Sequence, residues 1–514
     1  MKTHCHPPED RSRPWCSGGF VLLIVLVVVL LSSMLAASVL YAMRSEAAAH
    51  TASVQREQAW AAAMSGVARA LAVATDPGDA WMDWEDNPAM FQHQFVNQDG
   101  DDQWFFTVYS ASDSLGAEVR FGLTDESAKL SVRHHDAAWL GKLPGLDAKL
   151  AAALAGAVPR SETAPRTNSP SAASWAPDVS GRAGAGDPPS GTRPSETRLS
   201  EARPSEAQAS EAVPSIPAAS ASPVPSIEEW FAAAGLSSQL LYGEDANYNL
   251  RLDPDEDDGE TRKPLDNADG QLDRGLQQYL TTISYDLNVN SEGQPRINLN
   301  DAQADLSKSG LPQATLDYMA ALRRAGQSLS HAAALLEAEG EFQDAEGRPQ
   351  RLRSGIGREE LSVVLDQCTT TNAARLEGLI NVNTAPRAVL IAIPFVGEAL
   401  VDAILATRPG LTADEARTPA WLYRRGLVSA EEFKQIVPHL TTRSLQFGFR
   451  CLGYAVPSGR YRVLSVTVDT APQPPRVVAL RDLTRFGFPV PLAVLENGGA
   501  GGVLTTSAGG RPAW

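Results

Sequence analysis

The chain has 514 residues, a formal net charge of −17 and only four cysteines. This length exceeds what one hydrophobic core normally supports, so two or three domains are expected. The acidic balance repels phosphate backbones and anionic headgroups, which disfavours nucleic acid as a partner. The sequence lacks His-Glu-x-x-His, Gly-x-Ser-x-Gly and Walker patterns, so we expect no enzyme, with a secreted hydrolase as the remaining enzymatic alternative.

An uncharged apolar run extends from Phe20 to Met43. At a rise of about 1.5 Å per residue, a helix of this length matches a hydrocarbon layer of roughly 30 Å. Basic residues precede the run, so the positive-inside bias predicts a cytoplasmic N-terminus and places residues 44–514 on the other side of the membrane. The run therefore predicts a single membrane-spanning helix.

Two glycines, Gly18 and Gly19, stand directly before this run, whereas a secretory signal has a shorter apolar core followed by an Ala-x-Ala site. The arrangement resembles the leader of type IV prepilins and type II secretion pseudopilins. That resemblance implies cleavage by a prepilin peptidase between Gly19 and Phe20. Most members of the class carry Glu at the fifth mature position, here Ile24, and the minor pseudopilin K (GspK) family lacks it. An uncleaved membrane anchor is the alternative.

Helical periodicity continues past the membrane run, because apolar residues recur at spacings of three and four until residues 76–78, Asp-Pro-Gly, break the pattern. Two β-rich segments follow, residues 104–110 and 117–123, and turn residues between them predict a hairpin. A helix followed by an antiparallel sheet is an α+β arrangement and the layout of a pilin head.

A repeat then appears, in which Leu130 aligns with Ile380 and Leu150 with Leu400, an offset of 250 residues. A third, more degenerate copy starts at Ile297. Each copy predicts a short extended start, a helix, a Pro/Gly hairpin and a second helix, the outline of helix-hairpin-helix or SAM-like units. His134 and His135, in the first copy, are expected at the surface.

Helix-hairpin-helix modules can bind DNA, through a Gly-x-Gly hairpin whose N–H groups hold a phosphate. The hairpins here read Gly145-Leu-Asp and Phe395-Val-Gly, so neither keeps both glycines, and an Asp opposes an anion. We therefore expect hairpins kept for packing and no nucleic acid partner.

Residues 158–225 are rich in Ser, Ala, Pro, Glu and Arg, with a five-residue Ser-Glu repeat. Because such a segment cannot bury enough apolar surface to offset its ordering entropy, the composition predicts a flexible linker. Order is expected to resume at Ser226, a helix N-cap with Glu229 in the capping-box position.

The most chemically informative stretch is Asp245–Glu256, whose spacing matches a twelve-residue EF-hand loop. The expected Ca²⁺ ligands are the side chains of Asp245, Asn247, Asn249, Asp253 and Glu256 and the backbone carbonyl of Arg251. Position six, usually glycine, is Leu250, a departure expected to weaken binding or change its geometry. Hard oxygen ligands without His or Cys argue against zinc. A solvated acidic loop without a metal is the alternative.

A second, partial match follows, with Asp266, Asp269 and Asp273 as candidate ligands and Leu265 where the first ligand should be. These residues are expected either to complete the first Ca²⁺ site or to form a weaker second one.

Strands return at 445–454, 460–469 and 476–483, with the alternation of an antiparallel sheet that is buried on one side. The expected fold class is therefore α+β: a transmembrane helix and a pilin-like antiparallel sheet, interrupted by an inserted all-α SAM-like or helix-hairpin-helix domain. Cys368 and Cys451, the two cysteines beyond the membrane run, are expected either to pair or to be unrelated buried thiols.

Together, the leader, residues 381–386 (Asn-Val-Asn-Thr-Ala-Pro), the acidic loop and the strand layout resemble the GspK family over nearly the whole chain. The resemblance implies a minor pseudopilin at the pseudopilus tip, single-pass in the inner membrane with its bulk periplasmic, and other minor pseudopilins as partners. It also implies a calcium-binding inserted domain. The alternative is a membrane-anchored helix-hairpin-helix DNA-uptake protein or a type IV minor pilin.

The expected boundaries follow from these patterns. They are a leader at 1–19, a transmembrane helix at 20–43, the first part of the pilin-like domain at 44–132, a first helical unit at 133–157, the linker at 158–225, the inserted helical domain with the acidic loop at 226–440, the C-terminal strands at 441–490 and a flexible tail at 491–514.

Overall fold

The structure is a computed structural model that describes residues 18–75, 82–112, 119–157, 225–259, 261, 266–343 and 347–496. The chain folds into a mixture of helices and strands with a long N-terminal apolar helix and an antiparallel sheet. Most of the expected leader, the linker and the end of the expected tail lie outside the described residues.

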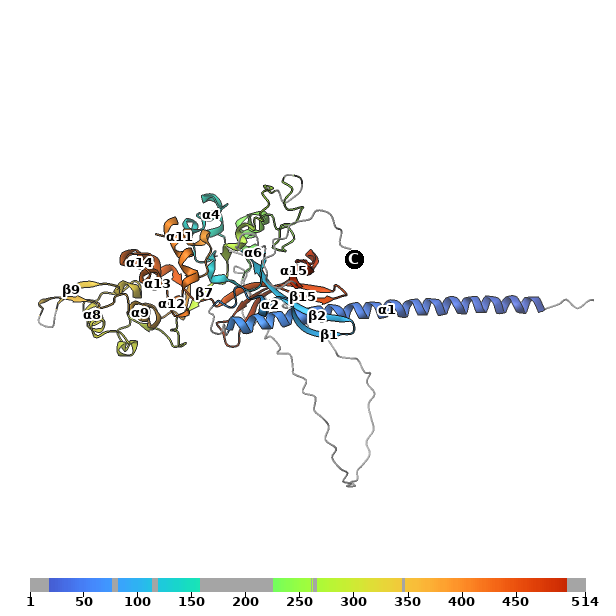
Figure 1. Ribbon diagram of the computed structural model, residues 1–514, viewed down its shortest axis with the longest axis horizontal. Helices are drawn as coiled ribbons and strands as arrows, with labels where there is room; N and C mark the ends of the chain where they lie inside the picture. Colours follow the sequence, from blue (N-terminus) through green and yellow to red (C-terminus); the bar gives the residue numbers. More distant parts are fainter. Residues whose placement is uncertain are drawn as a thin grey trace, which may run out of the picture.

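Helix α1, Gly18–Thr75, is continuous and has two different halves (Figure 1). From Leu22 to Met43 every residue is exposed, and this part is long and apolar enough to span a membrane. The C-terminal half instead buries Ala63, Val67 and Ala70 against the sheet. The helix ends directly before the predicted break at residues 76–78.

The sheet has the order β1-β2-β15-β16-β17, and all its pairings are antiparallel. Its strands are β1 (Gln94–Asp99), β2 (Asp102–Ala111), β15 (Gln446–Val456), β16 (Tyr461–Asp469) and β17 (Arg476–Asp482), with β3 (Val119–Arg120) on β2 and β4 (Thr124–Asp125) on β15. The central pair joins distant parts of the chain, since Val108 is opposite Cys451. The three predicted C-terminal strands are confirmed.

The predicted antiparallel pairing of residues 104–110 with 117–123 is present but short, because β3 pairs with β2 at only two positions. β2 forms a longer hairpin with β1, a strand that the sequence pattern does not indicate. The turn between β1 and β2 contains Gly100 at φ +60°, an Asp-Gly turn signal in the sequence. β1 itself is mostly polar because it is an edge strand, so its sequence shows little of the alternation that marks a strand.

Alternate residues of the sheet contribute to two cores. On one face Phe106 and Cys451 pack under α1, and on the other Phe105 and Leu452 pack with α15 (Leu492–Glu496). The helix approaches very closely at Gly66, where an added Cβ would overlap Sγ of Cys451 and lie 2.9 Å from the Phe106 ring. Glycine is therefore required at this crossing.

The chain between β4 and β15 forms three repeated units, each closed by a parallel pair of two-residue strands. The pairs are β5 (Leu130–Ser131) with β6 (Leu280–Thr281), β8 (Ile297–Asn298) with β11 (Cys368–Thr369) and β13 (Ile380–Asn381) with β14 (Leu440–Thr441). The same backbone hydrogen bond, from an N–H group to a carbonyl oxygen, recurs in each unit: Val132 donates to Thr281 at 3.1 Å, Leu299 to Thr369 at 2.8 Å and Val382 to Thr441 at 3.0 Å. The degenerate copy at Ile297 is thus a true structural repeat.

The helices of the units lie between these closing pairs. They are α3 (Ala137–Leu140), α4 (Ala148–Ala155), α6 (Ile227–Ala234), α7 (Ser238–Tyr242) and η2 (Gly275–Gln278) in the first; η3 (Leu306–Ser309), α8 (Gln313–Arg324), η4 (Ala332–Leu335) and α9 (Leu361–Gln367) in the second; and α10 (Arg387–Ala392), α11 (Glu398–Thr407), η5 (Arg408–Gly410), α12 (Ala413–Ala416), α13 (Trp421–Arg424), α14 (Ala430–Ile436) and η6 (Val437–His439) in the third. The predicted capping box at Ser226 and Glu229 is confirmed.

The helical block is not all-α as expected. It contains a hairpin of β9 (Glu339–Gln343) and β10 (Pro349–Arg353) and a short pair of β7 (Tyr285–Leu287) and β12 (Arg375–Glu377). The hairpin strands are built largely from Glu, Gln and Arg, which favour helices, so propensity does not reveal them. Charge pairing across the strands supports them instead: Arg353 lies 2.7 Å from Glu339.

Candidate metal centre

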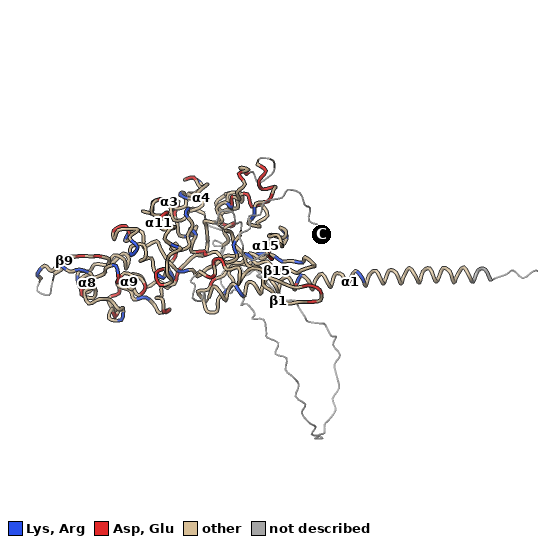
Figure 2. The backbone as a smooth tube through the Cα atoms, in the orientation of Figure 1, with Lys and Arg blue, Asp and Glu red and all other residues tan. Residues whose placement is uncertain are grey.

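The acidic loop lies between α7 and η2 of the first unit, and Figure 2 shows the acidic residues gathered on it. Its two ends are clamped together, because Glu244 N–H donates to the Asp273 carbonyl at 2.8 Å. Gly243 and Gly275 lie side by side at this base, at φ +65° and +55°. A Cβ added to either glycine would overlap the backbone of the neighbouring segment. The loop is therefore held at its base as a closed excursion.

Within the loop, the carboxylates at the first and last EF-hand positions hold the backbone. Asp245 accepts the N–H groups of Asn249 at 2.9 Å and Leu250 at 3.2 Å. Glu256 accepts those of Ala246 at 2.8 Å and Asp253 at 3.2 Å. Both acidic side chains are buried, so residues 245–256 form one folded turn around them.

The middle positions converge on one point. The side-chain amides of Asn247 and Asn249 donate to the same oxygen of Asp253, at 2.6 and 2.7 Å. A half-turn of either amide group would present its oxygen to that point instead, because the two ends of an Asn amide have the same shape. Arg251, the predicted carbonyl ligand, donates its N–H to Asn249 at 2.7 Å and stays within the turn.

The electrostatics of the loop favour a cation. Burial, with the neighbouring charges of Asp245 and Asp253, raises the pKa of Glu256 to about 7. Burial also raises the pKa of Asp245, opposed by the charge of Arg450 on β15. Ionising these carboxylates together is costly without a counter-ion. The donor set is carboxylate, amide and carbonyl oxygen, which fits Ca²⁺, and Asp245, Asn247, Asn249, Arg251, Asp253 and Glu256 would hold it.

Leu250, the departure from the EF-hand pattern, has a clear structural role. Its backbone is at φ +67°, the left-handed conformation that glycine usually supplies at this position. Its side chain is only 8% exposed and belongs to the core that contains Phe105, Tyr109 and Leu452 of the sheet. The loop therefore keeps the EF-hand turn and uses the side chain at position six to dock on the sheet.

The second group of predicted ligands is not brought together in the same way. Asp266 accepts three backbone N–H groups, including that of Gly259 at 2.7 Å, while Asp269 and Asp273 each accept a backbone N–H two residues on. Glu244 directly precedes Asp245 but is not among the predicted ligands; it is buried and accepts the N–H of Asp273 at 3.1 Å. Nearby Asp273 and Asp266 raise its pKa further, after burial itself.

Among the described residues, no three His, Cys, Asp or Glu side chains converge as a ligand cluster. The loop at 245–256 differs from such a cluster because two of its donors are amides and one is a carbonyl. Calcium binding stays a prediction, supported by the folded turn and the buried carboxylates.

Three other predicted features can be placed. The Gly19–Phe20 bond lies in the first turn of α1. Cys368 and Cys451 are both buried and free, in the helical block and under α1 respectively, so the unpaired alternative holds. His135 is buried and not at the surface as expected. Its Nδ1 accepts the backbone N–H of Ser131 at 3.0 Å, and its ring packs on Trp139.

Comparisons with protein families, with curated proteins and with solved structures gave no match.

Proposed function

We propose that this protein is a minor pseudopilin of a type II secretion system, cleaved by a prepilin peptidase between Gly19 and Phe20. The observation that carries the proposal is the division of α1 into two halves. Residues 22–43 are uncharged, mostly apolar and exposed, whereas Ala63, Val67 and Ala70 are packed on a sheet. Such a helix suits a subunit that first spans a membrane and later packs its exposed N-terminal half, residues 22–43, against neighbouring helices in a filament.

The position of the helical block supports a place at the filament tip. In Figure 1 the exposed N-terminal half of α1 extends from one end of the sheet, and elements α8, α9 and α14 lie beyond the opposite end. If subunits stack along α1, this block occupies the space into which a further subunit would be added. The protein then acts by assembly with other minor pseudopilins, in the inner membrane before assembly and with its bulk in the periplasm.

A calcium ion in the 245–256 loop would serve this role structurally. The loop docks on the sheet through Leu250 and closes the first helical unit at Gly243 and Gly275. Neutralising its carboxylates would fix the helical block against the sheet, so that the tip is rigid when partners bind.

The alternative, a DNA-uptake protein or type IV minor pilin, finds less support at the hairpins. Gly145 and Phe395 occupy equivalent positions at φ +79° and +65°. Phe395 is 68% exposed at the hairpin, where a phosphate-binding loop would need a second glycine.

Co-expression of the full chain with candidate minor pseudopilins tests the proposal. We expect detergent-solubilised complexes that depend on residues 22–43, and no salt-sensitive retention of DNA on filters. Salt-sensitive DNA binding with no pseudopilin complex would favour the uptake protein.

A further inference from the structure

A cavity of about 340 Å³ lies where the second and third helical units meet. Its walls include residues that follow both closing strands, Thr370 and Thr371 after β11 and Thr442 and Arg443 after β14. Strands β7 and β12 form another side, through Asp286 and residues 375–377. The cavity is thus built by the repeat itself and lies apart from the acidic loop.

The charged side chains that line this cavity are mainly cationic, in contrast to the acidic chain as a whole. Four are arginines, Arg296, Arg375, Arg417 and Arg443, against the carboxylates of Asp286 and Glu377. Glu377 is further engaged by His134 at 2.7 Å. The protein as a whole has a net charge of −17, so the surplus of positive charge in this cavity would attract an anion to this place.

Most of these groups are held by the protein, but Arg296 is not fully used. Arg443 pairs with Asp286 at 2.8 Å, and Thr441 donates to the other oxygen of that carboxylate at 2.8 Å. Arg296 donates only its Nε, to the Asp366 carbonyl at 3.1 Å. The residues that the structure describes give its two terminal nitrogens no hydrogen-bond partner.

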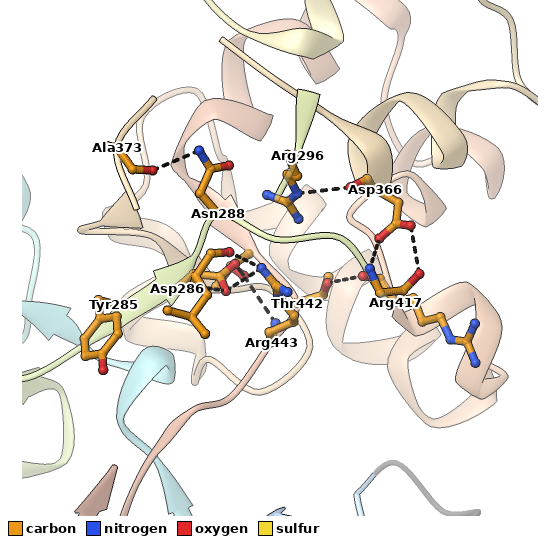
Figure 3. A network of polar contacts seen from close by, with 12 residues as sticks. Tyr285, Asp286, Asn288, Arg296, Asp366, Ala373, Arg417, Thr442 and Arg443 are labelled. Carbon is orange, nitrogen blue, oxygen red and sulfur yellow. Dashed lines mark hydrogen bonds and ion pairs between the residues drawn. The ribbon is translucent and has the colours of Figure 1, made fainter. Parts of the chain in front are cut away.

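Figure 3 shows the arrangement from close by. The Arg296 guanidinium points toward the Asp286–Arg443 pair, while that of Arg417 lies apart from both. Nε of Arg443 is buried and has no partner among the described residues. Two guanidinium groups therefore lie near one another with unused donors. The Asp286 carboxylate forms its ion pair with Arg443, and the Asp366 carboxylate, the other negative charge near Arg296, accepts hydrogen bonds from Ser291.

The remaining walls combine apolar side chains, among them Leu365, Pro419 and Val437, with His331 and several threonines. A free inorganic ion would leave this surface in contact with water. An organic anion would cover it, while its charged end accepted hydrogen bonds from the guanidinium fork.

From these observations we propose that the cavity binds a small organic carboxylate, whose charged group pairs with Arg296 and whose apolar part lies against Leu365 and Val437. This site is independent of the metal centre and of the pseudopilin assignment.

Calorimetric titration of the full chain in detergent micelles tests this site, with benzoate as the probe. Benzamide is the neutral match, and inorganic phosphate is an anion without an apolar body. We expect saturable benzoate binding, at least tenfold weaker in Arg296→Gln and intermediate in Arg296→Lys, which keeps the charge but loses the fork. Arg460→Gln, at an exposed arginine outside the cavity, should bind as the natural chain does.

Several results would overturn the proposal. These are the absence of saturable benzoate binding, equal binding by Arg296→Gln, or benzamide or phosphate binding as tightly as benzoate. Melting curves of each variant show whether it is folded. If Arg296→Gln is not folded, Arg296→Lys decides, because equal affinity in that variant contradicts the fork geometry.

Discussion

Replacing Leu250 by glycine separates two accounts of the acidic loop. If the loop were a free EF-hand loop, glycine at position six would relieve the backbone at φ +67° and stabilise the protein. If the loop is docked on the sheet, the substitution removes a buried side chain from the core with Phe105 and Leu452. The two accounts predict shifts of opposite sign.

The magnitudes favour destabilisation. Truncating a buried leucine costs about 2–5 kcal/mol. Relief of the left-handed conformation returns about 1–2 kcal/mol, and the greater freedom of glycine in the unfolded chain removes part of that gain. We therefore expect Leu250→Gly to lose about 2 kcal/mol, as the difference of these effects. Leu250→Ala loses the side chain but keeps the strain, so it should be the less stable of the two.

Urea unfolding of the full chain in detergent with calcium, followed by tryptophan fluorescence, provides the assay. The expected order of midpoints is the natural chain, then Leu250→Gly, then Leu250→Ala. A Leu250→Gly midpoint at or above that of the natural chain would refute docking through this side chain.

Three further predictions concern the loop, the helix–sheet contact and the junction between sheet and helical block. EDTA should lower the melting temperature, and the pair Asp253→Ala with Glu256→Ala should abolish that sensitivity; identical melting curves with and without EDTA in the natural chain would contradict a bound ion. Gly66→Ala should destabilise the protein by about 1–3 kcal/mol, because the added methyl group overpacks the contact with Cys451. The cost should be smaller in a background that carries Cys451→Ala, which removes the sulfur atom. Strict additivity in this double-mutant cycle would argue against the contact. Burial raises the pKa of Asp125 to about 6, although Thr384 and Ser444 donate hydrogen bonds to its carboxylate. As the pH rises from about 4 to about 6, the free energy of unfolding should therefore fall by about 3 kcal/mol more in the natural chain than in Asp125→Asn. Parallel pH profiles of the two proteins would refute this.

The sign of the Asp125 effect follows from proton binding. Its folded pKa is raised above the ordinary value of 3.8, so the folded state holds the proton to a higher pH than the unfolded state does. The stabilisation is complete below about pH 4 and is lost as the pH rises through about 6. The cause is the position of this carboxyl group, buried where β4 meets Asn381 of the third unit at 2.8 Å.

Local patterns predicted the elements whose signals are short-range. The end of α1, the capping box at Ser226 and strands β15–β17 follow from periodicity and cap chemistry within a few residues. The repeat at Leu130 and Ile380 was visible because the same packing demands recur. The EF-hand spacing predicted which residues turn around Asp245 and Glu256 for the same reason.

Features that depend on distant partners could not be predicted. β2 lies beside β15, more than 300 residues later, so the sequence around β2 does not name its neighbour. Leu250 looks like a defect until the sheet core is seen beneath it. Arg296 stands before an ordinary short strand, and only the meeting of two units surrounds it with other arginines.

N-terminal sequencing of the full chain, after co-expression with an active prepilin peptidase, tests the central claim most directly. The account predicts Phe20 as the first residue, and retention of the leader when Gly19 is replaced by valine. A chain that keeps Met1 while a pilin in the same cells is processed, or a cut beyond Met43, would contradict it.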